Sequence, residues 1–414
     1  LALIATPAMA LAGKKKPVPN CHGQVTAMLA SEGWTPRAVA DALAFDGPQE
    51  FHRFVKDLCD DYGTEGAYAE MYALVDGITV MTRNLYVGAN VFRLFQPHPF
   101  GIPGAVADLV ATVDQTDFPA RAEALADEIL AAGPDLIGLQ EVSLLRAYPA
   151  LFTPEWDPYP DFSSETVLYN YLDILLDALE DRGLDYSVVA QVEDADVILP
   201  RLTATGLDFV RLTDRDVILA RGDVTTTNGI GMQYAAAVPI TVTETVTVNF
   251  YRGYAAVDAT VNGYTYRFVN THLEVGSAAP VPFNYFQGLQ AQELMATLAP
   301  EELPIILLGD FNSDPMDPIA PAYGIISGAG YSDVWTTLDD PGPGYTFGFS
   351  ELLNDPTEMP YERIDLIWTR DGADLEFKSA TGYVVGDDPA LRTPSGLWPS
   401  DHAGVVATIR MMAP

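Results

Sequence analysis

The stretch Pro304-Ile305-Ile306-Leu307-Leu308-Gly309-Asp310-Phe311-Asn312 joins a short apolar run directly to a polar end. Four consecutive aliphatic residues between a proline and a glycine are typical of a buried β-strand. The polar residues would then stand at the carboxyl end of this strand, first Asp310 and two residues later Asn312. Layered α/β proteins bind ligands at such strand ends, so the stretch predicts both a strand and a site.

Other predicted strands end in the same way. Residues 78–83 lead to Asn84, residues 136–140 lead to Glu141, and a tyrosine-rich hairpin leads to His272. Ser400-Asp401-His402 stands immediately before the last predicted strand, residues 403–409. A single polar residue at a strand end is usually a turn former. Five such ends, which include two of only five histidines, indicate one shared active-site rim.

Amphipathic helices alternate with these strands after Gly77. The periodicity predicts helices over residues 119–132 and 165–182, the second with Val167 on its buried face. Asn262-Gly263 predicts a tight hairpin. Residues 241–249 are predicted to form one half-exposed strand, and residues 193–213 a long loop. Hairpins mixed with β–α units indicate an α/β protein whose sheets are mixed rather than purely parallel.

Six short motifs together resemble the endonuclease/exonuclease/phosphatase superfamily. They occur in the order of that superfamily over residues 77–411, and their combination is far more specific than any one of them. The resemblance implies an α/β four-layer sandwich, in which two mixed β-sheets pack face to face with helices outside, and metal-dependent hydrolysis of a phosphate ester. The motifs are Thr82-Arg83-Asn84, Leu139-Gln140-Glu141, Asn270-Thr271-His272-Leu273, Gly309-Asp310-Phe311-Asn312, Arg363-Ile364-Asp365 and Ser400-Asp401-His402.

The chemistry of these residues agrees with a catalytic role for five of them. Hydrolysis of a phosphoester needs an activated water and donors for the charge on the phosphoryl oxygens. Asp310 would orient or deprotonate the water, while Asn312 donates to the phosphoryl group. His272 would donate to the phosphate or to the leaving oxygen. His402 would act as a cation or a base, and by resemblance Asp365 is the carboxylate that orients it.

Three further residues are predicted to hold a metal ion. Glu141 offers a carboxylate oxygen suited to Mg²⁺, and Asn84 would hold a ligand or a phosphate oxygen beside it. The resemblance implies that Asp401 lies close to the ion. Mg²⁺ usually takes only one or two protein carboxylates and keeps several waters, so these few oxygen ligands are enough to bind it. Mn²⁺ and Ca²⁺ are alternatives.

Three structural alternatives remain open from the sequence. His272 could instead bond a backbone carbonyl within its hairpin, and Asp365 could pair with Arg363. Tyr285 and Phe286 form either an apolar lip for a lipid substrate or part of the packing of a helix that begins near Gln287.

The first 76 residues are predicted to contain an export signal and a disulfide. Residues 1–12 are almost wholly apolar and end in small residues, which predicts a signal-peptide remnant; the alternative is a buried strand or helix. Cys21 and Cys59 are the only cysteines, and export favours a disulfide over two free thiols. This bridge would stabilise a small hairpin of two helices, which are predicted over residues 36–44 and 48–58. We therefore expect a helical extension, residues 13–76, before a catalytic domain, residues 77–411.

The charge of the chain restricts its partners. The 414 residues include 22 Lys and Arg against 57 Asp and Glu, a formal charge of −35, and 48% of them are hydrophobic. Such a chain can form a core but lacks the basic patches that bind nucleic acid or anionic lipid, so no stable nucleic-acid complex is expected. No apolar run approaches the ~18 residues of a transmembrane helix. We expect a secreted or periplasmic monomer.

Departures from the family pattern leave two substrate classes. Tyr86 stands where abasic-site endonucleases carry an acidic residue, and the scarcity of Lys and Arg disfavours inositol phosphates. An exported enzyme would then hydrolyse nucleic acid, as a deoxyribonuclease does, or a phospholipid headgroup, as a sphingomyelinase does. The competing class is a non-catalytic binding or adhesive protein that retains the fold. Such a scaffold is expected to have lost some of the acid and histidine set, yet none is missing.

Overall fold

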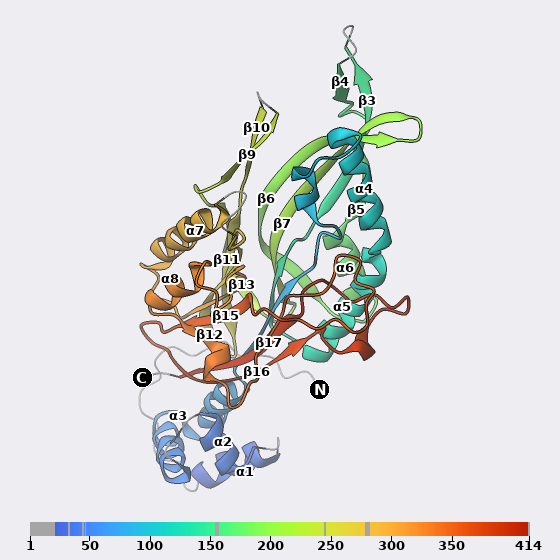
Figure 1. Cartoon of the computed structure of the whole chain (residues 1–414). Coiled ribbons are helices and arrows are strands. Elements are labelled where there is room, and N and C mark those ends of the chain that lie inside the picture. Colours follow the sequence, from blue (N-terminus) through green and yellow to red (C-terminus); the bar gives the residue numbers. More distant parts are fainter. Residues whose placement is uncertain are drawn as a thin grey trace.

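The computed structural model describes residues 21–31, 34–43, 45, 47–153, 157–243, 246–277 and 282–412. Two β-sheets pack face to face, and helices cover the outer face of each sheet (Figure 1). The predicted α/β four-layer sandwich of mixed sheets is therefore confirmed. The predicted signal-peptide remnant, residues 1–12, lies outside the described residues.

The larger sheet has nine strands in the order β16-β17-β1-β2-β7-β3-β4, and β5 pairs with β3 and β6 with β7. Strand β1 runs parallel to β2 and antiparallel to β17, and Asn84 is aligned with Gln140 at the ends of β1 and β2. The strands are β1 (Ile78–Asn84), β2 (Leu136–Gln140), β3 (Leu144–Phe152), β4 (Pro158–Pro160), β5 (Thr166–Asn170), β6 (Tyr186–Thr203), β7 (Gly206–Arg221), β16 (Glu376–Val385) and β17 (Gly404–Met412).

The smaller sheet has six strands in the order β14-β15-β13-β12-β11-β8. Strand β12 runs parallel to β13, and β13 runs antiparallel to β15. Asp310 is consequently aligned with His272 on one side and with Asp365 on the other. The strands are β8 (Thr225–Gln233), β11 (Gly253–Val261), β12 (Tyr264–His272), β13 (Ile305–Asp310), β14 (Ser332–Asp333) and β15 (Asp365–Arg370); β9 (Val238–Thr243) and β10 (Val246–Phe250) form a separate ribbon.

Alternation along the strands fills the layers on both sides of each sheet. In β13, Ile306 and Leu308 belong to the core between the sheets together with Val80 of β1. Ile305 and Leu307 belong instead to the outer core under α7 and α8. Each fully buried aliphatic side chain contributes about 1.5–3 kcal/mol to the free energy of unfolding, so this short apolar run ties three of the four layers together.

Helices α5 and α6 cover the larger sheet and α7 and α8 cover the smaller one (Figure 1). Helix α5 begins after the N-cap Asp117, whose side chain accepts a hydrogen bond from Ala120 N, and ends at Gly133 with a left-handed backbone. The helices of this domain are α4 (Gly101–Gln115), α5 (Phe118–Ala132), α6 (Tyr171–Glu180), α7 (Phe283–Leu298) and α8 (Ala322–Gly328), with short 3₁₀ turns η1 (Val91–Phe95), η2 (Val334–Thr337) and η3 (Pro389–Leu391).

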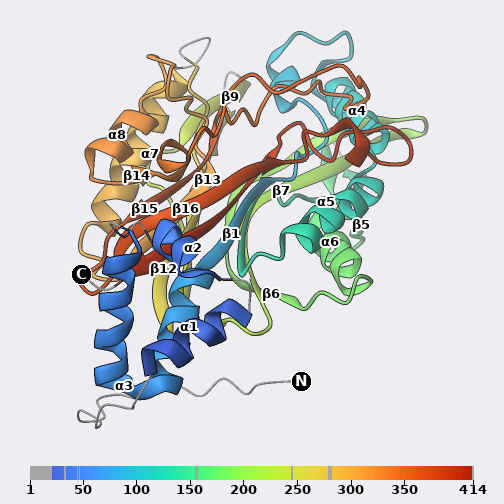
Figure 2. The ribbon, with the colours of Figure 1, turned by 90° about the horizontal axis from the view of Figure 1, so that it is seen from below.

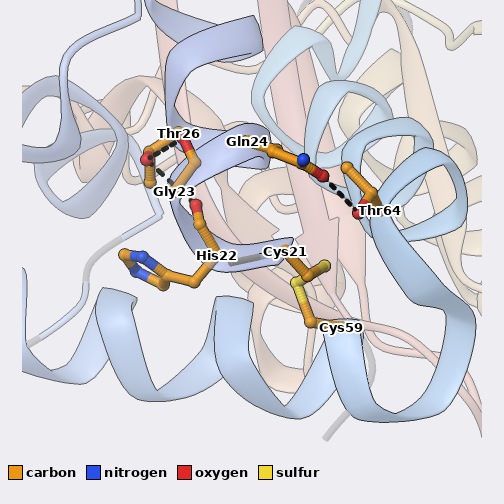
Figure 3. The surroundings of a disulfide bond; sticks show 7 residues. All are labelled: Cys21, His22, Gly23, Gln24, Thr26, Cys59 and Thr64. Carbon is orange, nitrogen blue, oxygen red and sulfur yellow. Dashed lines mark hydrogen bonds between the residues drawn. A yellow bond between two sulfur atoms is a disulfide. The ribbon is translucent and has the colours of Figure 1, made fainter. Parts of the chain in front are cut away.

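Helices α1 (Cys21–Ser31), α2 (Pro36–Ala42) and α3 (Pro48–Asp76) lie together at one end of the molecule (Figures 1 and 2). The predicted disulfide joins Cys21 of α1 to Cys59 of α3, with the two Cα atoms 5.9 Å apart (Figure 3). A small core behind it includes Phe51 and packs against Tyr264 and Met412 of the sheets. The two predicted helices are present, but α3 continues to Asp76 across a kink, and α1 was not predicted.

Three sequence predictions about local structure were wrong. The helix predicted over residues 165–182 begins only at Tyr171, because residues 166–170 pair with β3 as β5, and Val167 is 53% exposed. The single strand predicted over residues 241–249 is the two-stranded β9–β10 ribbon. Residues 193–213 are the arms of the long β6–β7 hairpin rather than a loop. Each error concerns strand pairing, which local periodicity does not encode.

Candidate active site

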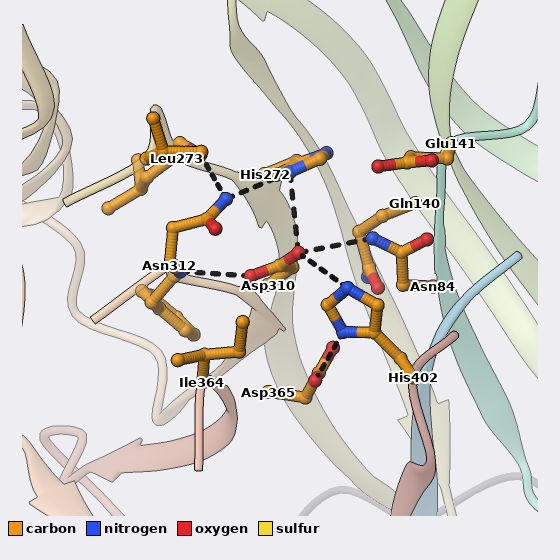
Figure 4. A network of polar contacts seen from close by, with 12 residues as sticks. Asn84, Gln140, Glu141, His272, Leu273, Asp310, Asn312, Ile364, Asp365 and His402 are labelled. Atoms are coloured by element: carbon orange, nitrogen blue, oxygen red, sulfur yellow. Dashed lines mark hydrogen bonds and ion pairs between the residues drawn. The ribbon is translucent and has the colours of Figure 1, made fainter. Parts of the chain in front are cut away.

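The eight predicted site residues converge where the strands of the two sheets end, and Figure 4 labels all of them except Asp401. Both parallel strand pairs, β1–β2 and β12–β13, end at this edge, and the loop before β17 crosses it. The residues are Asn84 at the end of β1, Glu141 directly after β2, His272 at the end of β12, Asp310 at the end of β13, Asn312 two residues later, Asp365 at the start of β15, and Asp401 and His402 before β17.

Asp310 is the centre of this network, and its side chain is almost inaccessible to solvent (Figure 4). Its Oδ2 atom accepts a hydrogen bond of 3.1 Å from Asn84 Nδ2 and lies 3.3 Å from His272 Nε2 and 3.7 Å from His402 Nε2. Its Oδ1 atom accepts from the backbone N–H of Asn312 at 2.9 Å. Burial raises the pKa of Asp310 to about 7, although the positive charge of His402 acts in the opposite direction.

His402 is held by Asp365. The Nδ1 atom of the ring lies 2.8 Å from Asp365 Oδ2, and both side chains are buried. Burial alone would lower the pKa of His402, but the carboxylates of Asp365 and Asp310 outweigh it and raise that pKa to about 10. The alternative pairing of Asp365 with Arg363 is not seen, because Arg363 donates to Asp333 at 2.7 Å.

His272 has a different environment. Its Nδ1 atom lies 2.9 Å from Arg252 Nη1, and its Nε2 atom faces Asp310 and lies 3.1 Å from Asn312 Nδ2. Burial and the positive charges of Arg252 and His402 lower the pKa of His272 well below its usual value. The ring therefore contacts site side chains, rather than a backbone carbonyl of its hairpin as the structural alternative had it.

The three predicted metal ligands present oxygen atoms from separate segments. Glu141, in a left-handed backbone conformation, accepts a hydrogen bond of 2.7 Å from Val87 N, and Asn84 Oδ1 accepts one of 2.8 Å from Tyr86 N. Asp401 Oδ1 lies 4.0 Å from His402 Nε2. Burial raises the pKa of Asp401 to about 7; His402 opposes this rise and the nearby Glu141 adds to it. A divalent cation would relieve such repulsion, and oxygen donors suit Mg²⁺.

Within the described ranges, one cluster of acidic and histidine side chains brings three ligand atoms within 4.8 Å of one another, namely Asp310, Asp365 and His402. In this cluster His402 Nδ1 already bonds Asp365. We therefore interpret the cluster as a hydrogen-bonded relay rather than a metal cage.

Arg121 supports the backbone next to two of the predicted metal ligands, Asn84 and Asp401, and sequence reasoning missed it. Its fully buried guanidinium donates to the backbone carbonyls of Leu85 (2.6 Å), Tyr86 (3.1 Å) and Pro399 (2.9 Å). These residues follow Asn84 and precede Asp401 in the chain. No motif marks an arginine in the first turns of an amphipathic helix, so only the fold reveals its role.

Asn270 joins the two sheets next to the site. It belongs to β12 of the smaller sheet, yet its Nδ2 donates to the carbonyls of Leu139 (2.9 Å) and Val217 (3.1 Å) of the larger one. Gln140 Nε2 donates to Asn270 Oδ1 at 2.6 Å. These buried bonds fix the distance between the sheets where the strands that carry the predicted site residues end.

Tyr285 and Phe286 were interpreted either as an apolar lip or as part of the packing of a helix, and the structure shows elements of both. Helix α7 already begins at Phe283, which is buried, and Phe286 packs partly against the same small cluster. Tyr285 is 62% exposed. The two rings contact each other edge to face with their centroids 5.6 Å apart, so Phe286 takes part in the packing of the helix while Tyr285 extends this aromatic surface toward solvent.

Buried carboxylates and histidines thus lie together at the joined edge of two packed sheets, a set of groups that is chemically suited to hydrolysis. The sequence profile described as the "Endonuclease/Exonuclease/phosphatase family" matches residues 89–402, and the chain belongs to that family. Members of this family hydrolyse phosphoester bonds and generally use divalent metals. No curated protein matches the chain.

Several solved structures are similar to this chain at low identity. An endonuclease/exonuclease/phosphatase family protein from Leptotrichia buccalis is 16% identical with a TM-score of 0.47, over 80% of this chain and 99% of that one. A mannosyl-6-phosphatase from Bacteroides thetaiotaomicron is 18% identical with a TM-score of 0.46, over 80% and 99%. TDP2 from Caenorhabditis elegans is 14% identical with a TM-score of 0.43, over 99% of each chain.

Proposed function

We propose that this protein is an exported phosphodiesterase that acts with a divalent cation, and that residues 77–411 form its catalytic domain. The observation that carries the proposal is the buried carboxylate of Asp310, one oxygen atom of which faces His272, His402 and Asn84. A buried acid between two histidines can exchange a proton with them or with a bound water. Burying a carboxylate costs free energy unless partners compensate it, and acids with a perturbed pKa cluster at functional sites.

The cation that we propose is Mg²⁺, held by Glu141 and Asp401, with Asn84 beside it for a ligand or a phosphate oxygen. When bound, it would polarise the phosphoryl group and neutralise developing charge. Support comes from the donor set, which consists of oxygen atoms, and from the mutual repulsion of Glu141 and Asp401 that contributes to the raised pKa of Asp401. Mn²⁺ and Ca²⁺ are ions of the same class to be tested.

The protein groups would carry out the proton transfer and the charge stabilisation. Asp310 accepts the proton of the attacking water, and its backbone bond to Asn312 fixes one carboxylate oxygen. His402, kept as a cation by Asp365, stabilises negative charge that develops on the phosphoryl oxygens. His272 and Asn312 supply further hydrogen-bond donors from the other side of Asp310.

The substrate that we propose is a phosphodiester, either a phospholipid headgroup or nucleic acid. The strong negative charge of the chain makes a stable nucleic-acid complex unfavourable, but it does not prevent turnover. In the described part of the chain, no helix is both long and apolar enough to span a membrane.

The test compares bis(4-nitrophenyl) phosphate with 4-nitrophenyl phosphate, with and without EDTA, in the wild type and in Asp310→Asn. We expect EDTA-sensitive hydrolysis of the diester that falls at least about 100-fold in the variant. Asp181→Asn, which removes an exposed carboxylate at the end of α6, is the matched control. Plasmid DNA, RNA, sphingomyelin, phosphatidylcholine and inositol phosphates, each with Mg²⁺, Mn²⁺ or Ca²⁺, then identify the substrate. No turnover of any substrate would indicate a non-catalytic binding protein that retains the fold.

A further inference from the structure

We propose that Arg252 is a positioning residue that fixes His272 as a neutral imidazole with its single proton on Nε2. This inference rests on the proposed function, because it concerns how His272 presents a hydrogen-bond donor to the site. Arg252 lies between β10 and β11 and belongs to none of the motifs that identify the site residues in the sequence.

Arg252 contacts His272 on the side of the ring that faces away from Asp310. Its Nη1 atom lies 2.9 Å from His272 Nδ1, and its side chain is only 16% exposed. Two carboxylates hold the guanidinium in place: Asp214 Oδ2 lies 3.6 Å from Nη1, and Glu274 Oε2 lies 3.9 Å from Nε. Asp214 comes from β7 of the larger sheet and Glu274 follows β12, so the arginine is held between the two sheets.

The position of the proton follows from the donor inventory. A guanidinium has N–H donors and no acceptor, so His272 Nδ1 must accept the hydrogen bond from Arg252. A neutral imidazole carries one proton, which then belongs to Nε2. An acceptor lies in reach there, Asp310 Oδ2 at 3.3 Å.

The second neighbour of Nε2 is compatible with this assignment. Asn312 Nδ2 lies 3.1 Å from Nε2 but donates to the carbonyl of Leu273 at 3.0 Å. If both Asn312 and Arg252 donated to His272, the ring would carry no proton at all, which is not a form that imidazole adopts near neutral pH. The proton on Nε2 is therefore required by the arginine contact.

The charges around His272 act in the same direction. A second proton on Nδ1 would point directly at the guanidinium of Arg252, and the cationic His402 lies on the far side of Asp310. The carboxylates of Asp214 and Glu274 lie behind Arg252, whereas Asp310 alone contacts the ring directly. The two histidines beside Asp310 thus differ: His402 is a cation, while His272 is a neutral donor that cannot serve as a general acid.

Long-range ¹H–¹⁵N NMR of the histidine rings tests this inference in the wild-type protein without reference to turnover. His272→Gln assigns the signal among the five histidines. We expect a protonated Nε2 and an unprotonated Nδ1 that do not change between about pH 6 and pH 8. A protonated Nδ1, or an imidazolium at pH 7, would overturn the inference.

Three arginine variants separate positioning from packing. In Arg252→Met we expect His272 to begin titrating within the same pH range, whereas Arg252→Lys, which also carries only donors, keeps the Nε2–H form. Arg211→Met removes an arginine of β7 that pairs with Asp196 of β6, and it serves as the control, with no change expected at His272. An unchanged His272 in folded Arg252→Met would contradict the inference. Diester turnover is assayed separately, so an Nε2–H ring in an inactive protein would refute the proposed function and leave the tautomer assignment intact.

Discussion

Asp365 Oδ2 and His402 Nδ1 are 2.8 Å apart, and this contact joins the start of β15 in the smaller sheet to the loop before β17 in the larger one. The two side chains form a charged pair that is buried between the two sheets. Because neither side chain has access to bulk solvent, the protonation of His402 depends on this partner.

Asp365→Asn removes the carboxylate and should lower both activity and stability. The pKa of His402, about 10 in the folded protein against 6.5 in the unfolded chain, should fall because its main counter-charge is lost. We expect about 3–5 kcal/mol less free energy of unfolding near pH 6, the usual cost of removing one partner of a buried ion pair.

The contribution of His402 to the free energy of unfolding should fall as the pH rises. A raised histidine pKa stabilises the fold fully below pH 6.5, and this stabilisation is lost as the pH rises through about 10. Urea unfolding across that window should therefore show a falling wild-type stability and a flatter profile for Asp365→Asn. Parallel profiles of the two proteins would contradict the linkage.

Asp310→Asn keeps the size of the side chain but removes the acceptor of the proton. We expect kcat for a phosphodiester to fall at least about 100-fold, while the far-ultraviolet circular dichroism and the binding of Mg²⁺ remain similar to the wild type. Steady-state kinetics at saturating Mg²⁺ measure the effect, with Asp181→Asn as the control. Activity within a few-fold of wild type would remove Asp310 from the proposed mechanism.

Binding of Mg²⁺ should release protons near pH 7. Because the pKa of Asp401 is raised to about 7 without a cation, a large fraction of its carboxyl groups is protonated there and must ionise when the ion binds. Isothermal titration calorimetry in two buffers of different ionisation enthalpy counts the protons. Asp401→Asn should reduce both the release and the affinity, and Glu141→Gln should reduce the affinity; equal release in Asp401→Asn would argue against this ligand.

Arg121→Met should destabilise the protein and weaken metal binding together. The buried guanidinium would leave the carbonyls of Leu85, Tyr86 and Pro399 without their donor, which we expect to cost at least about 3 kcal/mol. Thermal unfolding gives the first effect, and Mg²⁺ titration of the folded fraction gives the second. Arg121→Lys retains one cationic donor, so its stability and its Mg²⁺ affinity should lie between those of the wild type and Arg121→Met. A stable Arg121→Met with normal affinity would show that these loops keep their conformation without the guanidinium.

The double variant Cys21→Ser/Cys59→Ser should lose stability and keep activity. Closing a loop with a sequence separation of 38 residues stabilises a fold by about 2–4 kcal/mol. The core behind the disulfide meets β12 at Tyr264, roughly 26 Å by strand rise from His272 at the other end. We expect a lower melting temperature with unchanged kcat/KM. In the native protein, two readily alkylated thiols would show that the bridge is not formed.

The sequence predicted well those features that local chemistry determines. Strand β2 was predicted with its bounds unchanged, and the hairpin at Asn262-Gly263 is present because both residues have the positive φ that this turn requires. The eight site residues are brought together because they stand at strand ends, which periodicity and motif order reveal. Their catalytic and metal-binding roles remain predictions.

Other features depend on partners far away in the chain. Residues 166–170 have a helical pattern and form β5 only because β3 lies beside them. Arg252 and Arg121 carry no motif, and their importance comes from contacts with His272 and with three backbone carbonyls. Interactions of this kind become visible only when the sheets are packed.

The alignment of β13 with β15 has a consequence for engineering the rim. Asp310 and Asp365 are aligned across the two strands, and fixed hydrogen bonds between neighbouring backbones maintain this alignment. A slip by one residue would turn Asp365 to the opposite face of the sheet. Of the 54 residues between them, 311–364, the loop portions other than Asn312 can therefore be lengthened, shortened or exchanged to change substrate preference, while the backbone ladder keeps the two acids aligned.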